Sequence, residues 1–281
     1  MEKNVQTFIG CDDDYDESKI VIFGAPFDST TSFRPGTRFA SATMRSESFG
    51  IETYSPYQDK DLEDISVFDS GDLELPFGSP ENALSQIEKH TKIILDDNKI
   101  PLMIGGEHLV TLGCVRAVAK KYPDLFIVHF DAHTDLRDEY LQVKLSHASV
   151  IRRCFEIVGE KKIFQFGIRS GEKTEFEFAK KHLYINKFDF TGIEKIHEII
   201  KDSPVYFTLD LDVLDPSCFC GTGTPEAGGV SFLQLLSAIK QVLNLNIVGV
   251  DINELSPIYD QSGASTALAC KILREILLGI R

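Results

Sequence analysis

Eight short runs of apolar residues, rich in Ile, Val and Phe, recur along the chain and predict buried β-strands. Within each run the apolar residues are continuous, a pattern typical of strands buried on both faces of a parallel sheet. The runs are KIVIFGAP (19–26), DISVFDSGD (64–72), KIPLMIGGEH (99–108), LFIVHFDAHTD (125–135), KIFQFGIRS (162–170), HLYIN (182–186), VYFTLDLDVLD (205–215) and NIVGVDINE (246–254).

Helical patterns lie between these strands. Their apolar residues recur at helical spacing in segments 82–97, 109–121, 148–158, 231–243 and 264–279. The alternation of strand and helix predicts an α/β fold with helices on both faces of a parallel sheet. Because no linker or repeat interrupts the pattern, we predict a single domain over residues 1–281, with an acidic, solvated N-terminal segment at 1–18.

Polar residues follow four of the predicted strands at the points where the strands end. In open parallel sheets ligands bind outside the carboxyl ends of the strands, so these side chains are expected to gather at one edge. The four segments are GGEH (105–108), DAHTD (131–135), DLD (210–212) and DINE (251–254).

Two imidazoles and four carboxylates in these segments are candidate metal ligands. Alternate residues of an extended chain face one side, so the three ligands of DAHTD converge if the extended geometry continues. Six groups exceed the needs of one ion and fit two divalent ions bridged by carboxylates. Oxygen-rich ligation with a few imidazoles favours Mn²⁺ over a structural zinc. The six are His108, Asp131, His133, Asp135, Asp210 and Asp212.

The composition narrows the choice of partner. The chain has 29 Lys and Arg residues and 43 Asp and Glu residues, which give a formal charge of −14. A charge of this sign would repel nucleic acid and anionic membranes. We therefore expect neither as a partner, whereas a cationic small molecule is compatible. No signal peptide and no apolar stretch of about 18 residues is present, so we expect a cytoplasmic protein. Six scattered cysteines predict reduced thiols, and the lone pair Cys218 and Cys220 does not predict a zinc site.

Several of these motifs resemble the signatures of the ureohydrolases, the arginase and agmatinase superfamily. The strongest are GGEH (105–108), DAHTD (131–135) and DLDVLDPSCFCGTGTPEAGG (210–229), with GAPFD (24–28), RPGTRFA (34–40) and DINELSPIYD (251–260) beside them. The resemblance implies a three-layer α/β/α fold with a central eight-stranded parallel sheet. It also implies two Mn²⁺ ions, hydrolysis of a guanidinium group to urea and an amine, and a homo-oligomer, a trimer or hexamer.

The resemblance also implies how the six ligands divide between the ions. His108 and Asp135 resemble ligands of one manganese, His133 and Asp212 resemble ligands of the other, and Asp131 and Asp210 resemble the carboxylates that touch both.

Four residues resemble the family's catalytic and substrate-binding groups. Asp135 is expected to accept a proton or hydrogen bond from the attacking hydroxide, and His147 to carry a proton to the leaving amine. Glu254 is expected to bind the guanidinium through both carboxylate oxygens, the directional geometry of that pair. Thr224 and His147 are expected to contact the substrate as well.

The residues after DAHTD favour agmatine as the substrate. Arginases usually have Asn two residues after the last aspartate of DAHTD, whereas this chain has Arg137 there. The segment looks more like agmatinases, so we predict hydrolysis of agmatine to urea and putrescine, with Asp138 or Glu139 attracting its ammonium end. The alternatives are another ureohydrolase, namely aminopropylagmatine ureohydrolase, guanidinobutyrase, arginase or formiminoglutamase, and a catalytically silent binding member of the family.

Overall fold

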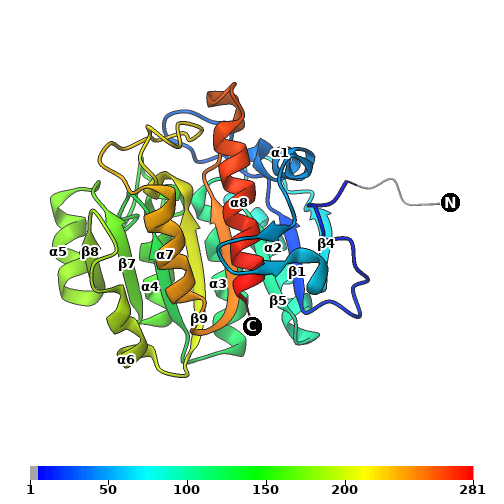
Figure 1. Ribbon diagram of the computed structural model, residues 1–281. Coiled ribbons are helices and arrows are strands. Elements are labelled where there is room, and N and C mark those ends of the chain that lie inside the picture. Colours follow the sequence, from blue (N-terminus) through cyan, green and yellow to red (C-terminus); the bar gives the residue numbers. More distant parts are fainter. Residues whose placement is uncertain (1–5, 281) are drawn as a thin grey trace.

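All eight predicted strands form, and they join one wholly parallel sheet. The computed structural model describes residues 6–280. The eight-stranded parallel sheet is the one predicted for an arginase-like fold, and the order across it is β4-β1-β5-β10-β9-β6-β7-β8 (Figure 1). The strands are β1 (Ile20–Gly24), β4 (Val67–Asp72), β5 (Ile100–Ile104), β6 (Phe126–Phe130), β7 (Ile163–Ile168), β8 (Tyr184–Lys187), β9 (Pro204–Asp210) and β10 (Asn246–Asn253). A small antiparallel pair, β2 (Tyr54–Ser55) and β3 (Lys60–Asp61), stands apart.

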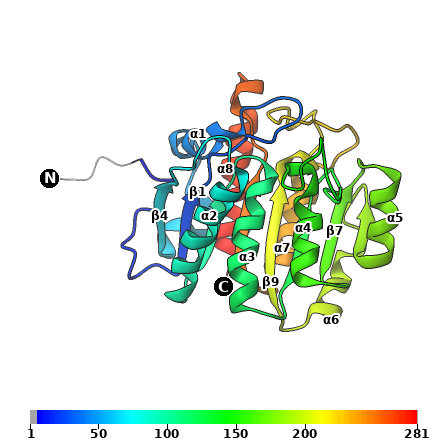
Figure 2. The same cartoon turned by 180° about the vertical axis from the view of Figure 1, so that it is seen from behind.

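Helices cover both faces of the sheet. One layer contains α2 (Pro80–Asp96), α3 (Thr111–Lys121) and α4 (Val150–Val158), which Figure 2 shows in front of the sheet. The opposite layer contains α7 (Phe232–Val242) and α8 (Ala264–Gly279), with α1 (Ala40–Glu47) against α8. Each end of α2, α3, α4, α7 and α8 lies within two residues of the end predicted from the sequence. Within residues 6–280, no helix is both long and apolar enough to cross a membrane.

Three helices were not identified from the sequence because each has too few apolar residues to form a clear stripe. Helix α1 buries two polar side chains among its four buried residues, and α5 (Lys173–His182) buries only Glu175 and Ala179. Helix α6 (Ile196–Ile200) is five residues long. Neighbouring strands and helices, rather than a periodic sequence pattern, fix these short segments.

Successive strand residues face opposite helix layers, and both layers are apolar. In β6, Phe126, Val128 and Phe130 pack in the core that contains α7 and α8. Ile127 packs in the other core, with α2, α3 and α4. Burial on both faces explains why the strand sequences are continuous apolar runs instead of alternating ones.

The predicted N-terminal segment is packed more closely than a solvated tail. Of residues 1–18, residues 1–5 lie outside the described part of the chain. The acidic side chains at 12–14, 16 and 17 are exposed, as expected. However, Phe8 and Cys11 are fully buried, and the Phe8 N–H donates to Asp69 at 2.9 Å. The Val67 N–H in turn donates to Asp13 at 3.0 Å, so this segment is held against β4.

The four central strands place the polar segments together. Strands β5, β10, β9 and β6 are neighbours, and each ends in one of the four predicted segments. All are parallel, so their carboxyl ends meet at one edge. The sheet thus forms the floor of the candidate site.

Gly106, in the loop after β5, has no room for a side chain. A Cβ on Gly106 would lie 2.0 Å from the Phe27 carbonyl oxygen, whereas a Cβ on Gly50 would have no neighbour within 4 Å. We expect Gly106→Ala to lower the free energy of unfolding by about 1–3 kcal/mol through overpacking. Gly50→Ala is the control and should change it by less than about 0.5 kcal/mol. Urea unfolding of both variants provides the measurement, and equal stabilities would contradict the expectation.

Candidate metal centre

All six predicted ligands converge at the carboxyl edge of the sheet. His108 begins the short helix after β5, and Asp210 is the last residue of β9. Five of the six are buried, and the side chain of His133 is 26% exposed where it faces a cavity. The remaining ligands come from the loop after β6 and from the turn after β9: Asp131, His133, Asp135 and Asp212.

Three carboxylates surround one nitrogen of His108. Its Nδ1 lies 3.1 Å from Asp131 Oδ2, 3.3 Å from Asp135 Oδ2 and 3.4 Å from Asp210 Oδ2. Neighbouring ligand atoms around an octahedral divalent ion with bonds of about 2.1 Å lie about 3.0 Å apart. Each of the three oxygens therefore lies at about the distance from Nδ1 that separates two ligands of one cation.

A second group of the same kind adjoins the first. His133 Nδ1 lies 3.0 Å from Asp212 Oδ2 and 3.5 Å from Asp131 Oδ1. Asp131 thus presents one oxygen to His108 and the other to His133. A carboxylate shared in this way is the bridge that a pair of cations requires.

The three ligands of DAHTD converge as predicted, but the extended geometry assumed for them does not continue through Asp135. Asp135 has a left-handed backbone with φ of 52°. The Gln165 side chain and the Ser170 backbone hold the loop between them, because the Thr134 carbonyl accepts from Gln165 and the Thr134 N–H donates to the Ser170 carbonyl. The turn redirects Asp135 toward His108.

The electrostatics of the cluster fit a cationic occupant. Burial, together with the charge of Asp131, raises the pKa of Asp135 to about 7. Burial, together with the charge of Asp212, raises the pKa of Asp210 well above its usual range. Although burial opposes a charged imidazole, hydrogen bonds with the surrounding aspartates raise the pKa of His108. Without cations Asp135 and Asp210 hold protons that divalent ions would displace, so the donor set fits the metal that the family implies.

Glu254 and Thr224 lie beside this cluster and line the cavity. Glu254 has a left-handed backbone, φ 68°, and its Oε1 accepts from the His108 N–H at 2.7 Å. Thr224 Oγ1 donates to Asp212 Oδ2 at 3.4 Å. Strained backbone held by such contacts is frequent at functional sites.

His147 faces the cavity from the start of the segment that leads into α4. Its Nδ1 lies 2.8 Å from the Thr30 carbonyl oxygen, which can only accept, so Nδ1 carries the proton. Nε2 is then an acceptor, 3.1 Å from Ser32 Oγ. Glu107 anchors Thr30 by accepting its N–H at 2.8 Å. Burial lowers the pKa of His147 to about 4, so the ring is neutral near pH 7.

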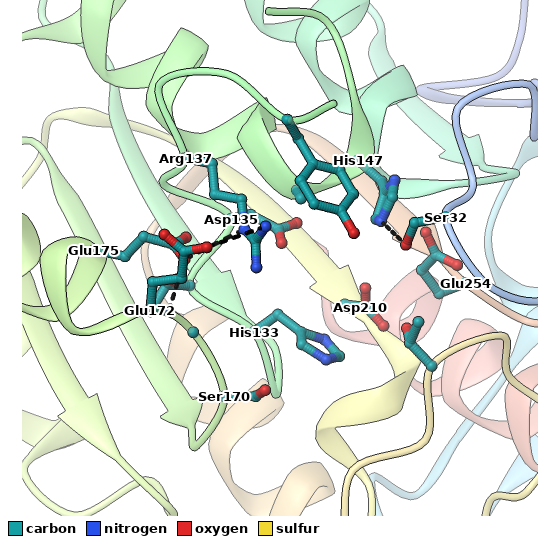
Figure 3. A pocket seen from close by; sticks show the side chains of 15 residues that line it. Ser32, His133, Asp135, Arg137, His147, Ser170, Glu172, Glu175, Asp210 and Glu254 are labelled. Carbon is teal, nitrogen blue, oxygen red and sulfur yellow. Dashed lines mark hydrogen bonds and ion pairs between the residues drawn. The ribbon is translucent and has the colours of Figure 1, made fainter. Parts of the chain in front are cut away.

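The cavity encloses about 320 Å³ and joins the cluster to the surface. Figure 3 shows Arg137, Glu172 and Glu175 on one side of it and His147 and Glu254 on the other. Arg137 Nη1 lies 3.3 Å from Glu172 Oε1, and Arg137 Nε lies 3.6 Å from Glu175 Oε2. The guanidinium of Arg137 also stacks on a cavity-lining tyrosine ring, 4.3 Å from its centroid.

The acids at the cavity mouth differ from those expected. Neither Asp138 nor Glu139 lines the cavity, and Asp138 instead pairs with Arg153 at 2.9 Å. Glu172 and Glu175 take that place, although the sequence analysis did not identify them. The available signal was their position just after the apolar run 162–170, at the same carboxyl edge of the sheet.

Comparisons with known proteins agree with this geometry. The model of the Arginase family matches residues 18–279. An agmatinase of Bacillus cereus is 46% identical over 279 residues, covering 98% of this chain and 96% of that protein. An agmatinase of Bacillus subtilis (strain 168) is 44% identical over 280 residues, with coverage of 98% and 96%. The crystal structure of agmatine ureohydrolase of Thermoplasma volcanium superposes with a TM-score of 0.90 at 35% identity, covering 99% of this chain and 94% of that one. The chain therefore belongs to the arginase family, as its motifs predicted, and is a hydrolase of amidino C–N bonds.

Proposed function

We propose that the protein hydrolyses the guanidinium group of agmatine to urea and putrescine at a centre of two Mn²⁺ ions. The observation that carries the proposal is the shared carboxylate. Asp131 lies between two imidazole nitrogens, each with further carboxylates around it, at the base of a cavity lined by Glu254. When bound, two divalent ions lower the pKa of water and so supply a nucleophile at neutral pH.

Glu254 would orient the guanidinium. Its Oε1 already accepts the His108 N–H, which anchors one end of the carboxylate where Glu254 lines the cavity. A planar guanidinium pairs with a carboxylate through two parallel hydrogen bonds, so it would bind in one orientation. Thr224 would supply a further contact from the opposite loop.

His147 would move the proton that the leaving amine needs. Because Nδ1 is occupied by the Thr30 carbonyl, only Nε2 faces the cavity, and there it can accept a proton. The low pKa of about 4 keeps that nitrogen unprotonated before the reaction. The proton that His147 accepts would be the one released by the attacking water, and the strongly acidic imidazolium would pass it readily to the departing amine. Asp135, deeper in the cavity, would accept a hydrogen bond from the nucleophile.

The cavity mouth supports agmatine over arginine. Agmatine ends in an ammonium and has no carboxylate, so an acid at the mouth is the complementary group. The Glu172 side chain is 58% exposed there, and Arg137 is already paired with Glu172 and Glu175. The similarity to proteins named agmatinase and agmatine ureohydrolase supports the same choice.

A panel of guanidino compounds tests the proposal. The protein, supplied with Mn²⁺, is offered agmatine, arginine, guanidinobutyrate and aminopropylagmatine, and urea is measured. We expect agmatine to give the highest kcat/KM, and Asp131→Asn to remove the activity. Urea from another compound but none from agmatine would refute the substrate. No urea from any of them would favour a silent binding member.

The mouth of the cavity generates a prediction on substrate affinity. We expect Glu172→Gln to raise KM for agmatine roughly threefold to tenfold, as loss of a partly exposed ion pair would, with kcat little changed. Glu172 is the N-cap residue of α5, and Gln keeps a side-chain oxygen at that position, so the helix should be preserved. Glu177→Gln is the matched control, because Glu177 lies on the same helix, 65% exposed and outside the cavity. Equal KM values for the two variants would disprove a role for Glu172.

The proton content of the cluster generates a prediction on pH. The raised pKa of Asp135, about 7, means that a metal ion must displace its proton below pH 7. Protons on His108 and His133, whose pKa values are also raised, must leave too. Mn²⁺ affinity should therefore rise with pH across the range 6–8, with protons released on binding. Calorimetry in buffers of different ionisation enthalpy measures this release, and a buffer-independent heat would contradict it.

A further inference from the structure

A row of buried polar side chains crosses four adjacent strands, just below the candidate ligands. In the register of the sheet, Asp251 of β10 pairs with Thr208 of β9, Thr208 with His129 of β6, and His129 with Gln165 of β7. All four are fully buried. We call these four residues the polar row.

The polar row points toward the layer of α2, α3 and α4. In β6, the residues on either side of His129, Val128 and Phe130, pack in the opposite core. Neighbours of Thr208 and Gln165, Phe207 and Phe164 among them, do the same. Since successive strand residues face opposite sides, the row shares a face with Asp131 and Asp210, which follow His129 and Thr208 by two residues.

At one end the polar row holds the nitrogen of His108 that faces away from the carboxylates. His108 Nε2 lies 2.8 Å from Thr208 Oγ1, which itself lies 3.4 Å from Thr111 Oγ1. Nδ1 is therefore the nitrogen that faces the three surrounding carboxylates. When a cation displaces the proton on Nδ1, Nε2 keeps its proton and donates it to Thr208, which is the tautomer that a metal ligand needs.

At the other end the polar row turns the protonated nitrogen of His129 toward the cluster. Gln165 Nε2 lies 2.7 Å from the Thr134 carbonyl oxygen, which can only accept, so that atom is the amide nitrogen. The same nitrogen lies 3.0 Å from His129 Nδ1 and donates to it. The proton of His129 is then on Nε2, which donates to Asp131 Oδ2 at 2.8 Å.

The two histidines thus differ in chemistry although they are close in space. Their ring centroids lie 5.1 Å apart, and both contact the same oxygen of Asp131. By distance alone, His108, His129 and Asp131 form a trio of metal-binding groups. A nitrogen that bears a proton has no lone pair for a metal, so the hydrogen bonds exclude His129 from the ligand set.

We propose that the polar row is the positioning layer of the metal centre, in which Thr208 holds His108 with Nδ1 toward the carboxylates and His129 donates to and orients the shared carboxylate Asp131. The inference rests on the proposed metal centre. His129 fixes Asp131 so that one oxygen faces each group of ligands. His129, Thr208 and Gln165 are positioning residues, because they act through the ligands and not on the substrate.

Nitrogen-15 NMR of the histidine side chains tests the tautomers directly. The full chain is measured both metal-free and with the diamagnetic ion Zn²⁺, and the His129 signals are assigned from their loss in His129→Gln. We expect an unprotonated Nδ1 and a protonated Nε2 on His129 in both samples. A protonated Nδ1 on His129 would overturn the proposal.

Mn²⁺ titration of variants tests the positioning role without relying on activity. His129→Phe keeps a ring but removes the donor and should weaken Mn²⁺ binding about 10- to 100-fold, as loss of a hydrogen bond to a ligand does. His129→Gln keeps a donor near the Nε2 position and should restore most of the affinity. Failure of this rescue, or a third bound ion in the wild type that His129→Phe loses, would overturn the proposal.

A matched pair of threonine variants separates positioning from stability. Thr208→Val removes the hydroxyl that accepts from His108. Thr91→Val removes a buried hydroxyl that contacts Cys114, away from the centre. Only Thr208→Val should weaken Mn²⁺ binding about 10-fold or more. Unchanged affinity in Thr208→Val and His129→Phe overturns this inference alone, whereas a wild-type chain that binds no Mn²⁺ refutes the proposed centre as well.

Discussion

Repulsion among buried carboxylates at the centre of the sheet is the constraint on which the site depends. Asp131, Asp210, Asp212 and Glu254 are all buried within one cluster. Each accepts a backbone N–H, and two of these bonds join different segments: Ala132 to Asp212 at 3.2 Å and His108 to Glu254 at 2.7 Å. The loops that carry the acids therefore also hold one another in place. Backbone donors offset part of the cost of burial, and the remainder requires cations or protons.

The rigid sheet makes this arrangement possible. Asp135 and Glu254 have left-handed backbones, which cost of order 1–3 kcal/mol each for residues other than glycine. Such conformations persist when neighbouring structure determines them. Here the paired ends of β5 and β10 hold the Glu254 segment, whose N–H donates to the Gly106 carbonyl at 3.0 Å. Close approach of these loops is also why Gly106 has no room for a side chain.

Sequence patterns predicted the strands and the cluster because both depend on local properties. Continuous apolar runs mark strands buried on both faces, and acids or histidines at their ends mark the edge where ligands bind. The polar row was not predictable in the same way. His129 stands within an apolar run, and its hydrogen-bonding state depends on Gln165, 36 residues away. Register between distant strands decides such contacts, and a single sequence does not reveal it.

The two ends of the cavity share only one segment of the chain. The guanidinium end uses residues that follow β5, β6, β9 and β10, whereas the mouth uses Arg137, Glu172 and Glu175, which follow β6 and β7. Glu175 is committed to structure, since it accepts from Thr134 Oγ1 at 2.6 Å and from two backbone N–H groups. Glu172 and Arg137 are more exposed, and among the described residues none of their hydrogen bonds or ion pairs joins them to the metal cluster. Substitutions at the mouth can therefore alter the choice of substrate while the chemistry at the base stays the same.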